Sequence, residues 1–175
     1  MIQICSNYCN QLHQEKYNDF TESLNFTSLT CSTCGVRGGC RRHAYYSRKI
    51  QTMHGKEDIR ILRVECSYCL ATHALLPKWI VPHSHHLVVD QVEIIRAFES
   101  GITLHQITPS NTAINIWNVI YIIKQYQYHW KQRLLAIKVS VFDEIEQLIP
   151  SCFASYNRQF MQIKRTRNLL FLQTT

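Results

Sequence analysis

Glycine and proline are scarce in this sequence, with 5 and 4 among 175 residues, and long hydrophobic runs are missing. The scarcity of both residues argues against a long flexible linker. No window approaches the roughly 18 consecutive apolar residues that a membrane-spanning helix needs. The N-terminus also lacks the basic start and apolar run of a signal peptide. These absences favour a cytoplasmic protein, in which cysteines serve as metal ligands or free thiols more often than as disulfides.

Catalytic motifs are also missing. The chain has no glycine-rich phosphate loop, no Gly-x-Ser-x-Gly elbow and no Cys-His-Asp order typical of a nucleophilic enzyme. The acids of the second half all fall in predicted helices, with no run of strands around them: Asp90, Glu93, Glu99, Asp143, Glu144 and Glu146. The sequence therefore predicts a protein that is not an enzyme and has no small-molecule substrate.

Two cysteine pairs are the most informative feature that is present. Cys31-Ser-Thr-Cys34 and Cys66-Ser-Tyr-Cys69 each place two thiolates at the spacing of a metal-binding knuckle. Four thiolates form a closed tetrahedral site, which is the structural arrangement for zinc. Here 31 residues separate the pairs, against roughly 15–20 in the compact pattern. The spacing predicts one structural Zn²⁺ held by Cys31, Cys34, Cys66 and Cys69.

The residues between the cysteine pairs resemble a β-hairpin. Strands are predicted at residues 44–50 and 59–65, with a turn at 53–58. Alternation of apolar and polar residues breaks at Leu62, which indicates a bulge or a strand covered on both faces. Two knuckles joined by a hairpin make a zinc ribbon, with its core at 31–70 in an N-terminal region 1–82. A unit this small needs its metal to fold.

Other side chains offer a second ligand set. Cys31, Cys34, Cys40 and His43 are spaced as a possible four-ligand group, and His73 could then help to form another site with Cys66 and Cys69. The single all-cysteine site is simpler, because the two pairs meet at the ends of a hairpin. In that arrangement His43 and His73 are packing or supporting residues.

Positive charge is concentrated on the predicted ribbon. Residues 31–70 contain eight Lys and Arg against three Asp and Glu, and residues 151–175 contain four against none. A localised basic patch is typical of a protein that binds a polyanion, although a solvated basic surface would give the same count. The candidate nucleic-acid contacts are Arg41, Arg42, Tyr45, Arg48, Lys49, Arg60 and Arg63. Neighbouring residues on a strand face opposite sides, so we expect one of Tyr45 and Tyr46 to be buried and the other exposed.

The second half, residues 83–175, is predicted to be mainly helical. Apolar periodicity predicts a helix at 87–99, one long helix from about Thr112 to Lys138, and a helix that begins near Ser140 and stops at Pro150. The apolar stripe of the long helix is Ile116, Ile120, Ile123, Trp130, Leu134 and Ile137. A basic tail begins at Lys164.

A histidine cluster lies at the start of this region. His83-Ser-His-His86, with Asp90 beyond it, suggests a catalytic metal site. A polar loop leading into a helix is the better interpretation, because an open catalytic site needs three fixed ligands and a position for water.

Several segments resemble one bacterial family. They are the Cys-x2-Cys-Gly motif at 31–35, Cys40-Arg-Arg-His-Ala-Tyr-Tyr-Ser-Arg48, Arg63-Val-Glu-Cys-x2-Cys69, Ala71-Thr-His-Ala-Leu-Leu-Pro77, Val81-Pro-His-Ser84 and 158–166. The chain is similar to a domain-of-unknown-function family from Firmicutes, which is itself similar to the N-terminal zinc-ribbon and helix-turn-helix part of insertion-sequence transposases. This resemblance implies DNA binding connected with mobile elements. Residues 102–109 leave barely one helical turn before proline, so the helix-turn-helix is degenerate.

Taken together, the sequence predicts an α+β protein: a small zinc ribbon followed by a mainly helical region with one long helix. The predicted function is zinc-dependent DNA binding of a transposase-related type, without catalysis, in the cytoplasm or at the nucleoid. Two alternatives stay open. One is a protein-interaction module that docks onto a partner of the transposition or transcription machinery, and the other is a decayed transposase fragment.

Overall fold

A computed structural model describes residues 1–5, 14–108, 113–166 and 169–173 of the chain. These residues form two compact units. We call residues 1–48, 58–79 and 166–175 the sheet unit, and residues 49–57 and 80–165 the helical unit. Each unit is described by itself below. The predicted division at residues 82 and 83 stays a prediction.

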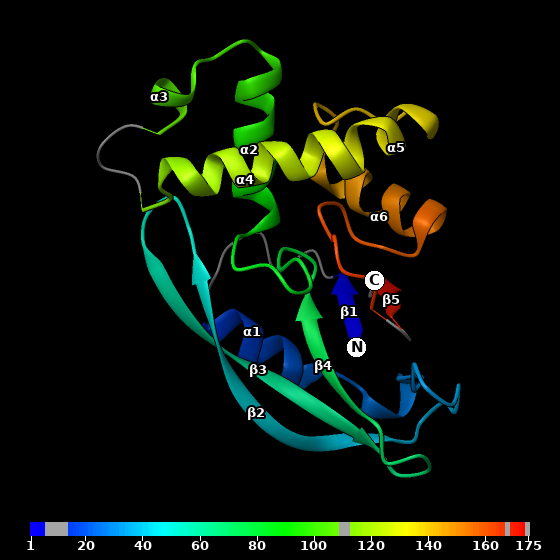
Figure 1. Cartoon of the computed structure of the whole chain (residues 1–175). Coiled ribbons are helices and arrows are strands. Elements are labelled where there is room, and N and C mark those ends of the chain that lie inside the picture. The colour runs from blue at the N-terminus through cyan, green and yellow to red at the C-terminus, as the bar shows by residue number, and fades with distance from the viewer. Residues whose placement is uncertain (6–13, 109–112, 167–168, 174–175) are drawn as a thin grey trace. The chain divides into compact units, whose positions relative to one another are not determined.

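The secondary structure is a mixture of helices and strands, as the sequence predicts (Figure 1). The strands are β1 (Ile2–Cys5), β2 (Cys40–Gln51), β3 (Lys56–Cys66), β4 (Thr72–Pro77) and β5 (Leu170–Gln173). The helices are α1 (Gln14–Ser23), the 3₁₀ turn η1 (Phe26–Ser28), α2 (Val88–Glu99), α3 (Leu104–Ile107), α4 (Ile116–Gln125), the π-helix η2 (Tyr126–Trp130), α5 (Lys131–Ala136) and α6 (Ile145–Tyr156).

All five strands belong to one sheet in the order β2-β3-β4-β1-β5 (Figure 1). β3 and β4 are antiparallel, whereas β1 runs parallel to both of its neighbours, β4 and β5. The predicted strands at 44–50 and 59–65 are present and longer than expected. They are two members of a five-stranded sheet, so the structure does not show the small self-standing hairpin of a zinc ribbon. Part of the predicted basic tail forms β5 instead.

The break in alternation at Leu62 comes from helix α1, which fills a gap between β3 and β4. Leu62 and its neighbour Ile61 are both fully buried. The backbone N–H of Leu62 donates to the Tyr17 hydroxyl (2.9 Å), and that hydroxyl donates to the Leu75 carbonyl (3.0 Å). Gln14 of the same helix bonds both the N–H and the carbonyl of Arg60. Side chains of α1 therefore replace ladder hydrogen bonds of the sheet.

Replacing Tyr17 with phenylalanine is expected to destabilise the sheet unit by about 1–3 kcal/mol. The ring still fills its site, but the buried N–H of Leu62 and carbonyl of Leu75 lose their common partner, and unpaired buried polar groups carry that penalty. Chemical denaturation measures the loss. Tyr128→Phe is the control, because the Tyr128 side chain is 80% exposed. Equal stability of both variants would contradict this bridging role.

In the helical unit, α4 packs across α2, with the one-turn helix α3 between them in sequence (Figure 1). The predicted helix at 87–99 is confirmed as α2. The one turn expected near residues 102–109 is α3, capped by the reciprocal hydrogen bonds of Thr103 and Gln106. Within the ranges described, every helix is too short or too polar to cross a membrane.

The predicted long helix is present as the continuous run α4-η2-α5, residues 116–136. Its expected start, near Ser110 and Thr112, lies outside the described residues. The buried stripe differs from the predicted one in the first half of the run: Val119, Ile122 and Tyr126 are buried, whereas Ile116 and Ile120 are only half-buried. The wider π turn at 126–130 accommodates an extra residue, which keeps Trp130 and Leu134 in line with the stripe before it.

The prediction that Pro150 ends a helix is wrong. α6 continues through Pro150 to Tyr156, and Asn157 ends it in the left-handed conformation with φ 49°. Proline removes one helical hydrogen bond, but Leu148, Ile149, Cys152 and Phe153 of this helix are all buried. Burial of that face outweighs the lost bond. Ser140 and Asp143 pair in a turn before the helix rather than at its first residue.

Candidate metal centre

Both cysteine pairs lie on tight turns with the same hydrogen bond. In the first, the N–H of Gly35 donates to the Cys31 carbonyl (2.9 Å); in the second, the N–H of Leu70 donates to the Cys66 carbonyl (2.9 Å). Gly35 and Leu70 are both left-handed, with φ of 77° and 58°. Glycine adopts this conformation freely, whereas a leucine is strained there. The equivalent backbone folds aim both pairs of sulfur atoms at one point.

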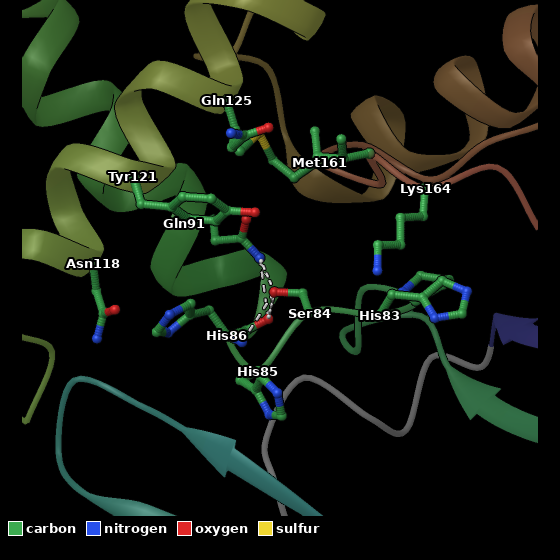
Figure 2. Close-up of a pocket in the computed structure, with 12 residues that line it drawn as sticks. His83, Ser84, His85, His86, Gln91, Asn118, Tyr121, Gln125, Met161 and Lys164 are labelled. Atoms are coloured by element: carbon green, nitrogen blue, oxygen red, sulfur yellow. Dashed lines mark hydrogen bonds between the residues drawn. The ribbon is translucent and has the colours of Figure 1, made fainter.

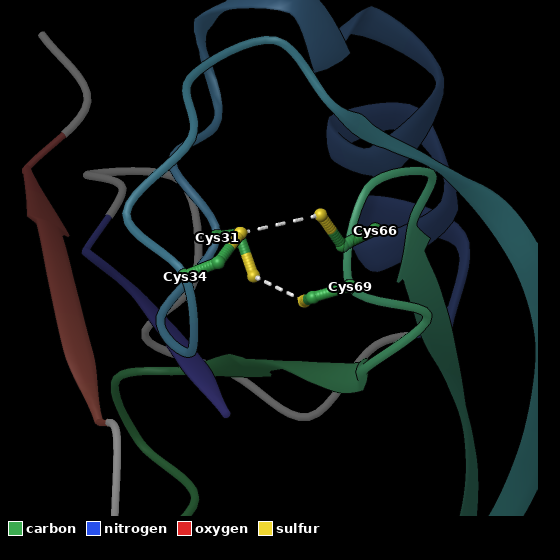
Figure 3. Close-up of side chains that lie close together, drawn as sticks. All are labelled: Cys31, Cys34, Cys66 and Cys69. Atoms are coloured by element: carbon green, nitrogen blue, oxygen red, sulfur yellow. Dashed lines mark hydrogen bonds between the residues drawn. The ribbon is translucent and has the colours of Figure 1, made fainter.

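The four sulfur atoms of Cys31, Cys34, Cys66 and Cys69 lie within 4.8 Å of one another. The Cys31 and Cys69 sulfurs are 3.6 Å apart, and those of Cys34 and Cys66 are 3.7 Å apart. Figure 3 shows the first pair facing the second across a small gap. A tetrahedron with metal–sulfur bonds of 2.3 Å has edges of about 3.8 Å, and a disulfide would need about 2.05 Å. The geometry fits a four-coordinate metal ion.

The surroundings of Cys31 favour its thiolate form. Burial opposes ionisation of Cys31, but hydrogen bonds from the N–H groups of Cys34 and Thr33 and from His73 outweigh it and lower the pKa of Cys31 to about 5. For Cys69, a hydrogen bond from the Ala71 backbone favours the thiolate, but desolvation and the neighbouring cysteines raise its pKa to about 12. Four adjacent thiols cannot all ionise unless a cation lies among them.

The alternative ligands lie outside this group. The Cys40 thiol is buried, and burial followed by the charges of the cluster raises its pKa to about 11. His43 Nδ1 lies 3.7 Å from a carboxylate oxygen of Glu65. His73 Nε2 is 3.2 Å from the Cys31 sulfur, and its Nδ1 is 3.1 Å from the Ser32 hydroxyl. Among the described residues, the set that could hold a metal consists of the four predicted cysteines.

Gly39 lets the turn that contains Cys66 and Cys69 pack closely against the start of β2. A Cβ atom at this position would lie 2.7 Å from the Tyr68 ring and 3.5 Å from the Cys66 sulfur. The Gly39 carbonyl also accepts a hydrogen bond from the Ser67 N–H (2.8 Å). A side chain at position 39 would therefore have to displace the exposed Tyr68 ring, a contact that the sequence does not reveal.

The predicted nucleic-acid residues do not share one surface. Arg41 is 64% exposed and pairs with Glu65 (2.8 Å). Arg42, its neighbour, turns to the other side of the strand, where it donates to the Thr21 carbonyl (2.6 Å) and lies over the Phe26 ring at 5.0 Å. These contacts give Arg42 a structural role, and successive residues of a strand face opposite sides.

Tyr45 contacts two of the other predicted residues: its hydroxyl accepts a hydrogen bond from Arg42 (3.4 Å), and its ring lies beside Arg60. Arg60 lies over the Tyr45 ring at 5.2 Å, and Arg63 donates to the Thr72 hydroxyl. Tyr45 is exposed, but Tyr46 is half-buried, so the expected burial of one tyrosine is not seen. Of the remaining candidates, Arg48 is half-buried, and Lys49, which is exposed, counts with the helical unit.

The histidine cluster does not form a metal site. Among the described residues, His83, His85, His86 and Asp90 do not converge into a group of three ligands. The Asp90 carboxyl is buried, which raises its pKa to about 6, and nearby Glu93 adds to the effect.

Comparison with known proteins gives one family. Neither curated proteins nor solved structures match the chain. Nothing in these comparisons links it to transposases or to Firmicutes, so that part of the resemblance stays a prediction. Residues 31–117, which begin at the first cysteine of the cluster and reach into α4, match a family model described as Domain of unknown function (DUF6431).

Proposed function

We propose that the four-cysteine cluster is a structural zinc site. Four cysteine sulfurs around one point are the donor set that zinc prefers in such sites, and they leave no open position for a substrate. The ion would join the turn before β2 to the turn after β3, and the hydrogen bond from His73 would hold the Cys31 sulfur in place. Zinc here would supply folding energy and no catalysis.

We propose further that the sheet unit binds DNA through exposed side chains of β2 and β3. One observation carries this proposal: Arg41, Tyr45, Arg60 and Arg63 are exposed residues of the strands β2 and β3, and Arg60 lies over the Tyr45 ring at 5.2 Å. We call these four residues the basic face. A guanidinium group stays charged at any physiological pH and fits a phosphate with two parallel hydrogen bonds.

The ion pair between Arg41 and Glu65 does not prevent such binding. Arg41 is 64% exposed, and exposed ion pairs contribute little to stability. A phosphate can therefore replace the Glu65 carboxylate as the partner of Arg41. Tyr45 would lie against a sugar or base, where its aromatic ring adds contact area.

A salt titration of duplex DNA binding tests the basic face. Wild-type affinity is expected to fall as salt rises, because bound arginines displace counterions from the phosphates. The double variant Arg60→Glu/Arg63→Glu is expected to bind DNA roughly a hundredfold more weakly. The plot of log K against log salt should also become less steep, with the magnitude of its slope smaller by about 2. Fluorescence anisotropy measures both quantities.

The matched control is Lys16→Glu/Arg37→Glu. Both residues are exposed, both lie in the sheet unit, and neither belongs to the basic face. The control makes the same change in net charge and should retain most of the affinity. Absent binding at low salt, or equal loss in the two double variants, would refute a DNA-binding basic face.

A protein-interaction module is the second candidate, and exposed aromatic residues favour it. Trp117, Tyr121 and Tyr128 lie along the run α4-η2 with exposed fractions of 75%, 55% and 80%. Trp117 and Tyr121 are four residues apart and so lie on one side of α4, and exposed apolar side chains that gather in this way often mark protein contacts. Charge reversal on the basic face would leave a protein complex intact, whereas Trp117→Ser would disrupt it.

A further inference from the structure

The helical unit contains a pocket of about 390 Å³, a volume in the range of small-molecule sites. Figure 2 shows Asn118, Tyr121 and Gln125 of α4 on one side and Lys164 with His83 on the other. Ser84, His86 and Gln91 lie between these two groups (Figure 2). Every lining residue belongs to the helical unit.

The residues that line the pocket favour a negatively charged ligand over a cation. None of its lining residues is Asp or Glu, whereas Lys164 and three histidines contribute positive or ionisable groups. The histidines do not converge on a metal position among the residues described. An anion is the charged group that such a wall favours.

His86 supplies a buried ring nitrogen without a partner. The side chain is only 8% exposed, and its Nδ1 atom has no hydrogen-bond partner. Burial lowers the pKa of His86, although a bond to the Gln51 backbone opposes the shift. A neutral imidazole donates from one ring nitrogen and accepts at the other. An unpaired buried polar atom is costly, and this one belongs to a residue of the pocket wall.

Flat groups and amides line the rest of the pocket. The Tyr121 ring is 55% exposed, so one of its faces is available for stacking. Gln125 and Asn118 have amides that can both donate and accept, the pattern used to recognise the edges of nucleobases. His83 and Met161 in the wall are left-handed, with φ of 64° and 63°. Such strained residues concentrate at binding sites.

We propose that this pocket binds a nucleoside monophosphate, with the base against Tyr121 and the amides and the phosphate beside Lys164 and His83. This proposal does not depend on zinc or on the basic face. The sequence predicted no small-molecule substrate, and it gives no sign of this pocket because the lining residues come from segments between residue 82 and residue 164.

Isothermal titration of the full chain with AMP, GMP, CMP and UMP tests the proposal. At least one nucleotide is expected to bind at one site per chain. The corresponding nucleoside, which lacks phosphate, should bind at least tenfold more weakly. It loses the hydrogen bonds between the charged phosphate and the protein, and the loss of such bonds weakens binding by about that factor. Absence of binding up to millimolar concentration, or equal affinity for nucleoside and nucleotide, would overturn the proposal.

Two pairs of variants separate the pocket from general charge. Lys164→Gln is expected to weaken nucleotide binding roughly tenfold or more, whereas Lys124→Gln, an exposed lysine of α4 that does not line the pocket, should not. Tyr121→Leu should weaken binding about fivefold or more through lost stacking, whereas Tyr128→Leu should not. All four side chains are exposed, so folding should be retained. Equal effects within either pair would overturn the site.

The same chemistry could come from a free nucleotide or from the end of a nucleic-acid strand. A short single-stranded oligonucleotide with a 5′-phosphate distinguishes the two sources. Tighter binding than the mononucleotide, lost in Lys164→Gln, assigns the site to a strand end. Weaker or absent oligonucleotide binding beside a retained mononucleotide site assigns it to a free nucleotide.

Discussion

Replacing Cys66 with serine is expected to remove the metal and unfold the sheet unit. Cys66 is buried, and its sulfur is 3.7 Å from that of Cys34 on the other turn. With three thiolates the site loses much of the roughly 10–16 kcal/mol that structural zinc contributes to folding. The metal-to-protein ratio, measured by elemental analysis, should fall from about one to near zero, and circular dichroism should lose sheet signal.

Three control variants test the other candidate ligands. Cys40→Ala and His43→Gln should keep the metal, because neither side chain belongs to the four-sulfur group. His73→Gln should also keep it but bind it about 10–100-fold more weakly, the usual effect of losing a hydrogen bond to a ligand. Metal and fold retained in Cys66→Ser would contradict the four-cysteine site. Metal lost in Cys40→Ala would make Cys40 a ligand.

Replacing Trp130 with alanine is expected to destabilise the helical unit by about 3–5 kcal/mol, the usual cost of deleting a large buried aromatic side chain. Trp130 is fully buried at the end of the π turn. Its ring meets Phe160 edge-on with centroids 5.4 Å apart and Tyr156 at 6.2 Å, and the Arg133 guanidinium lies 5.3 Å from it. Thermal and chemical denaturation followed by circular dichroism measure the loss.

Trp117→Ala is the matched control on the same helical run. Trp117 is 75% exposed, so its removal should change stability by no more than about 0.5 kcal/mol. Metal content should be unchanged in both tryptophan variants, because the four cysteines belong to the sheet unit. Similar destabilisation by both changes would show that the Trp130 contacts do not hold this unit together.

Local patterns in the sequence predicted local structure well. The spacing within each cysteine pair predicted two knuckles, and the apolar periodicity of 87–99 predicted α2. Local patterns gave wrong predictions where contacts with distant segments decide which residues are buried. The apolar periodicity of the long helix assumed a uniform α-helix, but the π turn at 126–130 changes which residues are buried. Pro150 looked like a stop because a single residue does not show how much buried surface the rest of α6 contributes.

The sequence by itself determined the donor set and the charge: four cysteines in two close pairs, and arginines in excess between them. Ligand type and short spacing depend on the chain nearby, so they can be derived from the residues alone. Only the tertiary structure decided that β1 and β5 complete the sheet, that Arg42 donates to the Thr21 carbonyl, and that segments from residue 82 to residue 164 form a pocket. These features depend on contacts between residues far apart in the chain, which no local pattern specifies.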